Sequence, residues 1–193
     1  MNLKTAFIKY CTQNKFLENK RQLHTIELLD KFYIGKKTSI FNFFKKNLNK
    51  SIKKVFYLTG DVGVGKTMIL DFFYNHINIL KQRFHFNEFM INFHNFRHEY
   101  EKKNKNNSIE SFVKELKKKN NLIYLDEFQV TNIVDAMILG KLFEIIIKEN
   151  ILIIITSNTK IEDLYKDGLQ REQFLPFIDV IKKNSIQKKL IIE

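Results

Sequence analysis

Residues 55–67 read Val55-Phe56-Tyr57-Leu58-Thr59-Gly60-Asp61-Val62-Gly63-Val64-Gly65-Lys66-Thr67, and this stretch decides the fold. An apolar run typical of a strand leads into G-x-x-x-x-G-K-[ST], the phosphate-loop (Walker A) pattern. Its glycines let successive backbone N–H groups turn toward phosphate oxygens, where a Cβ atom would obstruct them. Residues 68–74 continue as an apolar segment compatible with a helix. Strand, loop and helix in this order predict a nucleotide-phosphate site.

The loop assigns an expected role to each residue type. Lys66 is expected to reach the β- and γ-phosphates of ATP, and Thr67 is expected to bind Mg²⁺. The alternative is a glycine-rich turn that happens to end in Lys-Thr, and the flanking strand and helix argue against it. The predicted nucleotide-binding residues are Gly60, Asp61, Val62, Gly63, Val64, Gly65, Lys66, Thr67 and Met68.

Composition places the chain among globular proteins. It has 193 residues, 44% hydrophobic and 13% aromatic, which is enough for one sizeable core. Its single cysteine, Cys11, excludes an internal disulfide and favours a reducing compartment. The first residues lack a signal-peptide pattern, and we find no run of roughly 20 apolar residues that would span a bilayer. We therefore expect a soluble, cytoplasmic protein.

The charge is strongly basic. With 33 basic and 21 acidic residues the net charge is +12, which makes nucleic acid, acidic lipid surfaces or acidic proteins plausible partners. The charge does not choose among these partners. Lysine and asparagine are abundant along the whole chain, as biased coding in an AT-rich genome would also produce. Nucleic-acid binding is therefore an open possibility that we do not favour.

Two regions differ in their apolar patterning. Residues 1–50 read as an N-terminal helical extension, because Leu23, Ile26, Leu29 and Tyr33 recur at three- and four-residue steps. In residues 51–193, apolar strands alternate with helical segments, which predicts an α/β core with a parallel five-stranded sheet covered by helices. Residues 99–107 read as an exposed connection. The expected strands are residues 55–59, 84–90, 122–125, 151–156 and 190–192.

Adjacent carboxylates end the third expected strand. Asp126 and Glu127 follow four apolar residues, so they should lie at the edge of the sheet where ligands bind. Asp126 is expected to hold Mg²⁺, and Glu127 to activate the water that attacks the γ-phosphate. An Asp-Glu pair alone is also common as a cap of the following helix. Combined with the phosphate loop, the pair favours hydrolysis over binding alone.

Asn158 follows the fourth expected strand and lies in Thr156-Ser157-Asn158. At this edge of the sheet it is expected to touch the γ-phosphate or the attacking water, the role called sensor one in ring-forming ATPases. The alternative is that Ser-Asn caps the helix that follows.

Arg171 lies in the segment 168–178. Its permanently charged guanidinium suits a finger that reaches the γ-phosphate in a neighbouring subunit. A surface salt bridge with Glu172 or Asp167 is an equally good interpretation. The aromatic-rich residues 83–98 are interpreted as core and helix packing, with stacking on bases or partner binding as the alternative.

These blocks resemble the ZapE-type ATPases of bacterial cell division, with AFG-type mitochondrial relatives, in the AAA+ superfamily. The similarity covers about residues 22–180. It implies an Mg²⁺-dependent ATPase that forms homo-oligomers through the nucleotide site, with Arg171 as the trans-acting finger. It also implies contact with the division-ring protein, or with membrane proteins and a mitochondrial-matrix location in the organellar branch. The similar blocks are residues 60–68, 83–90 with His94, 126–139, 156–158, 164–165 and 168–178.

Three departures from the family pattern qualify these expectations. Asn132 replaces an aspartate, and Ile161 stands where a proline is typical. The chain also ends soon after the fifth expected strand, where family members continue into a helical lid that carries a second sensor arginine. We therefore expect that the chain binds ATP loosely, hydrolyses it poorly, or is a fragment of a longer protein.

The function expected from the sequence is ATP hydrolysis coupled to the remodelling of a protein partner. One alternative is a DNA-associated AAA+ ATPase of helicase-loader type, which the charge supports. The other is a hydrolysis-deficient interaction module.

Overall fold

The computed structural model describes residues 2–42, 53–103 and 106–191. Within them, five parallel strands form one sheet in the order β2-β3-β4-β1-β5. Because all five strands are parallel, each connection between consecutive strands crosses over the sheet, and helices form these crossovers. The strands are β1 (Val55–Thr59), β2 (Lys81–His85), β3 (Leu122–Asp126), β4 (Leu152–Ser157) and β5 (Ser185–Lys189).

The central strands are apolar on both faces because helices cover both faces of the sheet. Every residue of β1, β3 and β4 is buried. Alternate residues enter different cores: Tyr57, Ile123 and Ile153 pack on one face, and Phe56 and Tyr124 pack on the other. Continuous apolar runs are what this two-sided burial requires.

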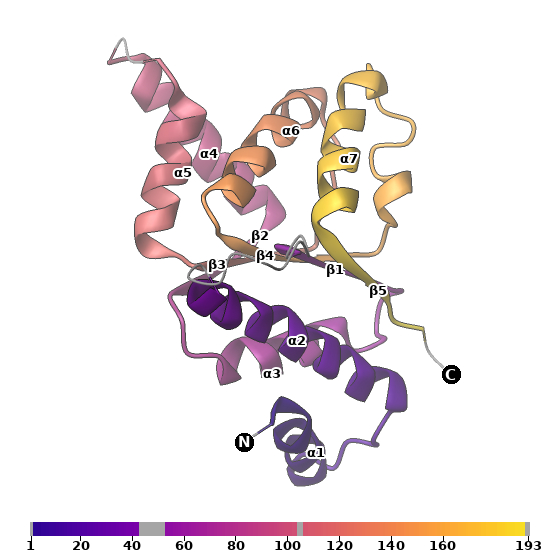
Figure 1. The fold of residues 1–193 in the computed structure, drawn as a ribbon. Coiled ribbons are helices and arrows are strands. Elements are labelled where there is room, and N and C mark those ends of the chain that lie inside the picture. Colours follow the sequence, from indigo (N-terminus) through magenta and orange to yellow (C-terminus); the bar gives the residue numbers. More distant parts are fainter. Residues whose placement is uncertain (1, 43–52, 104–105, 192–193) are drawn as a thin grey trace.

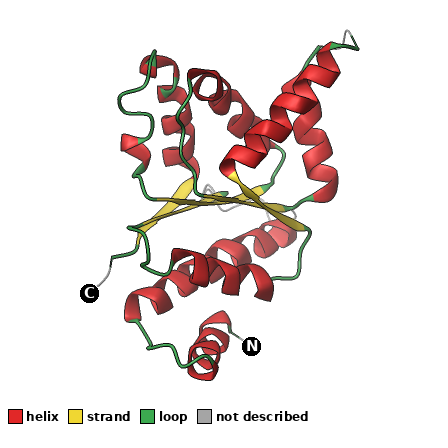
Figure 2. Cartoon of the chain, turned by 180° about the vertical axis from the view of Figure 1, so that it is seen from behind, coloured by secondary structure: helices red, strands yellow, loops and turns green. Residues whose placement is uncertain are grey.

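The helices form one layer on each face of the sheet (Figure 1). One layer holds α4 (Phe86–Glu101), α5 (Ser108–Lys119), α6 (Ile133–Lys148) and α7 (Leu175–Asn184). The other holds α2 (Lys20–Asn42) and α3 (Lys66–His76), with α1 (Leu3–Gln13) packed outside them. The reverse view in Figure 2 shows the same layers. The predicted three-layer α/β fold with a parallel five-stranded sheet is therefore confirmed.

Residues 2–42 form two helices, α1 and α2, which share a core with the sheet. Phe7 of α1 and Ile26, Leu29 and Phe32 of α2 are buried together with Phe56 of β1. The predicted boundary near residue 50 falls within residues 43–52, outside the described part of the chain. The division into an extension and a core stays a prediction.

The second strand is wrongly placed by the apolar pattern, which predicts a strand over 84–90, of which only residues 84 and 85 lie in β2. Strand β2 ends at His85, and α4 begins at Phe86. Phe84 and Phe86 alternate as in a strand, but Phe86, Phe89 and Phe93 recur at helical spacing and form the buried face of α4. Their burial agrees with the interpretation of this aromatic block as core packing. The same helix runs to Glu101, so the predicted connection at 99–107 starts later than expected.

The last strand is also wrongly placed. We predicted residues 190–192, whereas β5 is Ser185–Lys189; Ile192 lies outside the described residues. As an edge strand, β5 buries only Ser185, its other positions are half-buried or exposed, and it carries lysines, so it lacks an apolar signal. Leu190 follows it, and its N–H donates to the carbonyl oxygen of Thr59 at 2.8 Å.

The parallel register brings the ends of three strands to one edge. Thr59 of β1 is level with Ser157 of β4, and Leu125 of β3 is level with Ile155 of β4. The residues that follow these strands therefore meet at the carboxyl edge, where open α/β sheets bind ligands. None of the helices within the described ranges is long and apolar enough to cross a membrane.

Candidate functional site

The loop after β1 needs glycine at specific positions. Gly65 precedes α3 with a φ of 88°, in the left-handed region, and a Cβ atom there would lie 2.9 Å from Nε2 of Gln22. A Cβ atom on Gly60 would lie 2.5 Å from the carbonyl oxygen of Leu190. Other residue types would strain or clash at both positions. The loop conformation therefore depends on the glycines of the predicted motif.

The loop and two strand ends enclose a cavity of about 630 Å³. Eight of the predicted site residues come together there. They are Val62, Gly63 and Gly65 of the loop, Lys66 and Thr67 from the start of α3, Asp126 and Glu127 from the end of β3, and Asn158 after β4. The complete lining is Val62, Gly63, Gly65, Lys66, Thr67, Asp126, Glu127, Phe128, Gln129, Thr156, Ser157, Asn158 and Thr159.

Lys66 places its ammonium group among oxygen atoms at the mouth of the loop. Its Nζ donates to the carbonyl oxygens of Gly60 at 2.6 Å and Asp61 at 2.8 Å, and to Oδ1 of Asn158 at 2.9 Å. Partial burial lowers the pKa of Lys66, while the carboxylates of Asp61 and Asp126 act in the opposite direction. An ammonium surrounded by acceptors in this way suits an exchange of carbonyl oxygens for phosphate oxygens.

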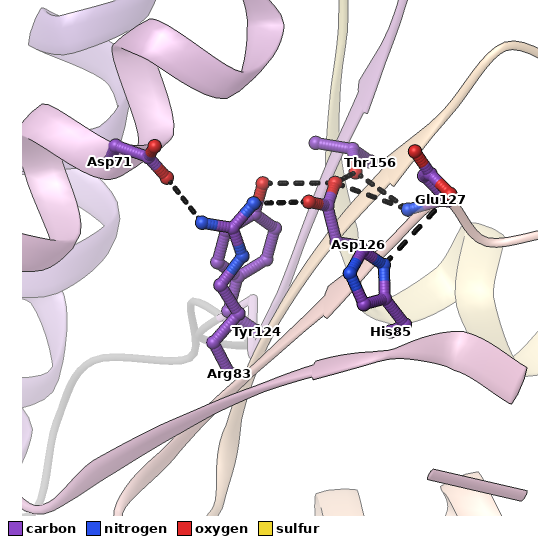
Figure 3. Close-up of polar contacts among 7 residues, drawn as sticks. All are labelled: Asp71, Arg83, His85, Tyr124, Asp126, Glu127 and Thr156. Atoms are coloured by element: carbon purple, nitrogen blue, oxygen red, sulfur yellow. Dashed lines mark hydrogen bonds and ion pairs between the residues drawn. The ribbon is translucent and has the colours of Figure 1, made fainter. Parts of the chain in front are cut away.

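Asp126 is held by hydrogen bonds on both carboxylate oxygens (Figure 3). Oδ1 accepts from the hydroxyls of Thr156 and Tyr124, and Oδ2 accepts from Nη2 of Arg83. Burial alone would raise the pKa of Asp126, but the hydrogen bonds from Thr156 and Arg83 outweigh it and hold the pKa below its ordinary value. The carboxylate is therefore ionised and fixed in one orientation at neutral pH.

Glu127 differs from its neighbour in exposure. Its side chain is 81% exposed, and its backbone has a φ of 54°, a left-handed conformation that is uncommon for residues other than glycine. The N–H of Glu127 donates to Oδ1 of Asp126 and to Oγ1 of Thr156, both at 3.1 Å. These bonds hold the turn that directs Glu127 to the cavity, while Asp126 stays in the sheet.

The acidic pair does not cap the next helix. Helix α6 begins at Ile133, and its N-cap is Asn132, whose Oδ1 accepts from the N–H of Asp135 at 2.8 Å. Asparagine supplies this cap as well as the family's usual aspartate would. Nε2 of His94 on α4 lies 2.7 Å from Oδ1 of Asp135 and links the two helices.

The alternative role for Asn158 as a helix cap also fails. The short helix η1 (Ile161–Asp163) is preceded by Lys160, without a side-chain cap. Ser157 donates to the carbonyl oxygen of Phe128 at 2.7 Å and accepts from the N–H of Thr159, which fixes the turn. Asn158 is thereby left facing Lys66.

Arg171 does not line the cavity of its own chain. It begins η2 (Arg171–Gln173), and its Nη2 donates to the carbonyl oxygen of Glu162 at 2.6 Å. Among the described residues no carboxylate lies within 4.0 Å of Arg171, so the predicted surface salt bridge with Glu172 or Asp167 does not form. A role at another chain's site stays a prediction.

The remaining loop residues contribute backbone or packing. Gly60 and Asp61 offer carbonyl oxygens to Lys66. Val64 is buried in the core beneath the loop, and Met68 packs against the same core. Neither side chain reaches the cavity.

The donor atoms fit Mg²⁺. Thr67 offers a hydroxyl and Asp126 an ionised carboxylate in the same cavity. Mg²⁺ prefers oxygen ligands and is commonly held by one or two protein groups together with substrate phosphates. Two such residues beside a phosphate loop are therefore a sufficient protein contribution.

Four contributors were not predicted as site residues. Thr156, Tyr124 and Arg83 hold Asp126, and the side-chain amide of Gln22 lies against Gly65. Thr156 could have been found, since it precedes Asn158 on a strand ending at the same edge. Arg83 opens the aromatic-rich block, which we interpreted as core packing, and Gln22 lies far from the phosphate loop in sequence. Only the packing brings both to the site.

The chain matches a family model and part of the length of known proteins. Residues 1–187 match the family model described as AFG1-like ATPase. Lactation elevated protein 1 homolog B of Danio rerio is 42% identical over 138 residues, covering 66% of this chain and 27% of that protein. Cell division protein ZapE of Escherichia coli is 37% identical over 129 residues, covering 66% of this chain and 34% of that protein. The chain thus aligns with about a third of the length of these relatives.

Solved structures agree on the fold. DnaI matches with a TM-score of 0.57 at 18% identity, covering 90% of this chain and 87% of that chain. AMPPCP-bound DnaA from Aquifex aeolicus matches with a TM-score of 0.58 at 17% identity, covering 93% of this chain and 50% of that chain. At such identities the likeness concerns the AAA+ P-loop fold alone. The family match over residues 1–187 confirms the resemblance predicted from the motifs, and the chain belongs to the AFG1-like ATPase family.

Proposed function

We propose that the chain binds ATP with Mg²⁺ in the cavity at the carboxyl edge of the sheet and hydrolyses it. One observation carries the proposal: Lys66, Thr67, Asp126, Glu127 and Asn158 line the same cavity although they come from three separate segments. Phosphoryl transfer depends mainly on positioning and charge neutralisation, and this residue set supplies both. Family membership supports the same reaction.

Binding begins with the triphosphate in the loop. The Lys66 ammonium exchanges its bonds with the carbonyl oxygens of Gly60 and Asp61 for bonds to phosphate oxygens. Thr67 and Asp126 would hold Mg²⁺, which when bound neutralises charge on the β- and γ-phosphates. The low pKa of Asp126 keeps this ligand ionised throughout the neutral range.

Hydrolysis is assigned to Glu127 and Asn158. Glu127 is exposed to the cavity, so its carboxylate orients the attacking water and accepts its proton. Asn158 senses the γ-phosphate or the water through its amide, and its bond to Lys66 couples it to the loop. Both carboxylate oxygens of Asp126 accept hydrogen bonds that fix the group in place. We therefore assign Asp126 to holding Mg²⁺ and not to accepting the proton.

The assembly is proposed from the position of Arg171. This residue lies outside its own cavity, which supports its use as a finger at the site of a second copy in a homo-oligomer. Turnover would then drive a conformational change in a protein partner. The relative named cell division protein ZapE supports a partner that acts in cell division. We propose the division-ring protein as this partner and the cytoplasm as the location.

Phosphate release from ATP by the purified chain tests the proposal. We expect release that requires Mg²⁺, stops with chelator and is absent from Glu127→Gln protein purified in parallel. Binding without release, in repeated preparations, would favour the hydrolysis-deficient interaction module instead.

A DNA-associated ATPase is the second candidate. The net charge of +12 favours it, and the fold is shared with DnaI and DnaA. Filter binding of single-stranded DNA at rising salt separates the candidates. Affinity that falls steeply with salt would support nucleic-acid contacts, whereas no retention at low salt would exclude them.

A further inference from the structure

Arg83 joins two carboxylates that no motif connects (Figure 3). Its Nη1 donates to Oδ1 of Asp71 at 2.7 Å, and its Nη2 donates to Oδ2 of Asp126. The guanidinium lies 4.8 Å from the ring centre of Tyr124. The side chain is 34% exposed and that of Asp126 only 7% exposed, so the pair is partly shielded from solvent.

The sheet register explains why these groups meet. Arg83 of β2 is level with Tyr124 of β3, and Asp126 follows Tyr124 by two positions, so the three side chains share one face of the sheet. That face is covered by α3. Asp71 is four residues after Thr67, one turn further along this helix on the same side.

The bridge therefore spans both halves of the magnesium site. Thr67 lies on the helix that Arg83 contacts through Asp71, and Asp126 is the carboxylate that Arg83 contacts directly. A planar guanidinium can serve two carboxylates at once because its N–H groups have a fixed geometry. A lysine at this position would keep the charge but could not reproduce the fork.

We propose that Arg83 is a positioning residue for the magnesium site, setting Asp126 and the helix that carries Thr67 at the separation that the metal requires. The proposal rests on the proposed function, since it concerns the same Mg²⁺. Partners of metal-binding carboxylates orient the ligands, and their loss typically costs about 10- to 100-fold in metal affinity.

The test measures binding, without turnover. A fluorescent, non-hydrolysable ATP analogue is titrated onto the purified full chain, first in chelator and then over a series of Mg²⁺ concentrations. The variants are Arg83→Gln, Arg83→Lys and Asp71→Asn. Arg97→Gln is the matched control, because Arg97 forms a surface pair with Glu101 on α4, away from the cavity.

We expect the Mg²⁺ concentration for half-maximal binding to rise about tenfold or more in Arg83→Gln. This Mg²⁺ concentration should rise nearly as far in Arg83→Lys, since a lysine cannot make both contacts, and less in Asp71→Asn. Affinity measured in chelator should stay within about twofold of the original, because Lys66 and the loop are unchanged. Adding Asp71→Asn to Arg83→Gln should have no further effect, because the link is already broken.

An unchanged Mg²⁺ requirement in the Arg83 variants would overturn the inference while leaving the proposed function intact. A lower requirement would overturn it too, since Arg83 would then compete with the metal for Asp126. If Arg83→Gln loses its folded circular dichroism signal, Asp71→Asn decides the question, because Asp71 is 44% exposed and its loss breaks only the helix link. Failure of the original chain to bind the analogue would instead refute the proposed function.

Discussion

Lys66 donates a hydrogen bond of 2.9 Å to Oδ1 of Asn158, across 92 residues of sequence. The contact joins the phosphate loop after β1 to the turn after β4, the neighbouring strand. Any displacement of Lys66 toward a phosphate would therefore change its hydrogen bond with Asn158. This link is the simplest physical route by which the site could register its nucleotide.

Asn158→Ala should lower turnover more than binding. The change removes the amide that senses the γ-phosphate or the water, and we expect hydrolysis to fall about 10- to 100-fold. Nucleotide affinity should change by less than about fivefold, because Lys66 retains its other contacts. Steady-state phosphate release beside equilibrium binding checks both, with the exposed Asn95→Ala as control. Equal losses in both quantities would contradict the sensor role.

Glu127→Gln should separate binding from hydrolysis. The amide keeps the size of the side chain but cannot accept the proton, so hydrolysis should fall about 10²- to 10⁴-fold. Binding of ATP should be retained, since Asp126 and not Glu127 is held at the metal position. The exposed Glu144→Gln controls for loss of a carboxylate. Undiminished hydrolysis in Glu127→Gln would refute the assignment of the base.

Arg171 should act on a second copy of the chain. Arg171→Ala should leave nucleotide binding unchanged and reduce hydrolysis about 10³-fold or more. Mixing Arg171→Ala with Lys66→Ala should restore part of the activity, because one copy supplies the nucleotide site and the other the finger. If the mixture stays as inactive as the separate variants, the trans-acting role is wrong.

Cys11 should resist modification in the folded protein. The thiol is buried, and burial together with the charge of Glu18 raises its pKa above the usual value. Since the thiolate is the reactive form, labelling should be slow at neutral pH and should accelerate only at a pH above that of a free thiol. Absorbance-based thiol titration with and without denaturant measures this, and rapid labelling of the native chain would show that α1 is not docked.

The central strands and the phosphate loop could be predicted from the sequence because each leaves a strong local pattern in it. Burial on both faces demands the apolar runs of β1, β3 and β4, and the tight loop demands glycine. Asp126 and Asn158 could be placed because parallel strands end at a common edge.

The remaining features depend on contacts between distant segments. An edge position removes the apolar signal from β5, so the pattern selected residues 190–192 instead. Phe86 continues the alternation of β2 but belongs to α4, whose helical spacing becomes visible only beyond it. The sequence gives no sign that Arg83 contacts Asp126, because only the strand register places Arg83 beside Tyr124.

The central claim is that the cavity binds a nucleoside triphosphate through Lys66. The most direct measurement is equilibrium binding of ATP, in the presence of Mg²⁺, to the original chain, to Lys66→Ala and to the exposed control Lys119→Ala. Loss of charged hydrogen bonds of about 1.5–3 kcal/mol should weaken binding by Lys66→Ala roughly tenfold to a hundredfold or more, with Lys119→Ala unchanged. Equal affinity in all three proteins would contradict the account.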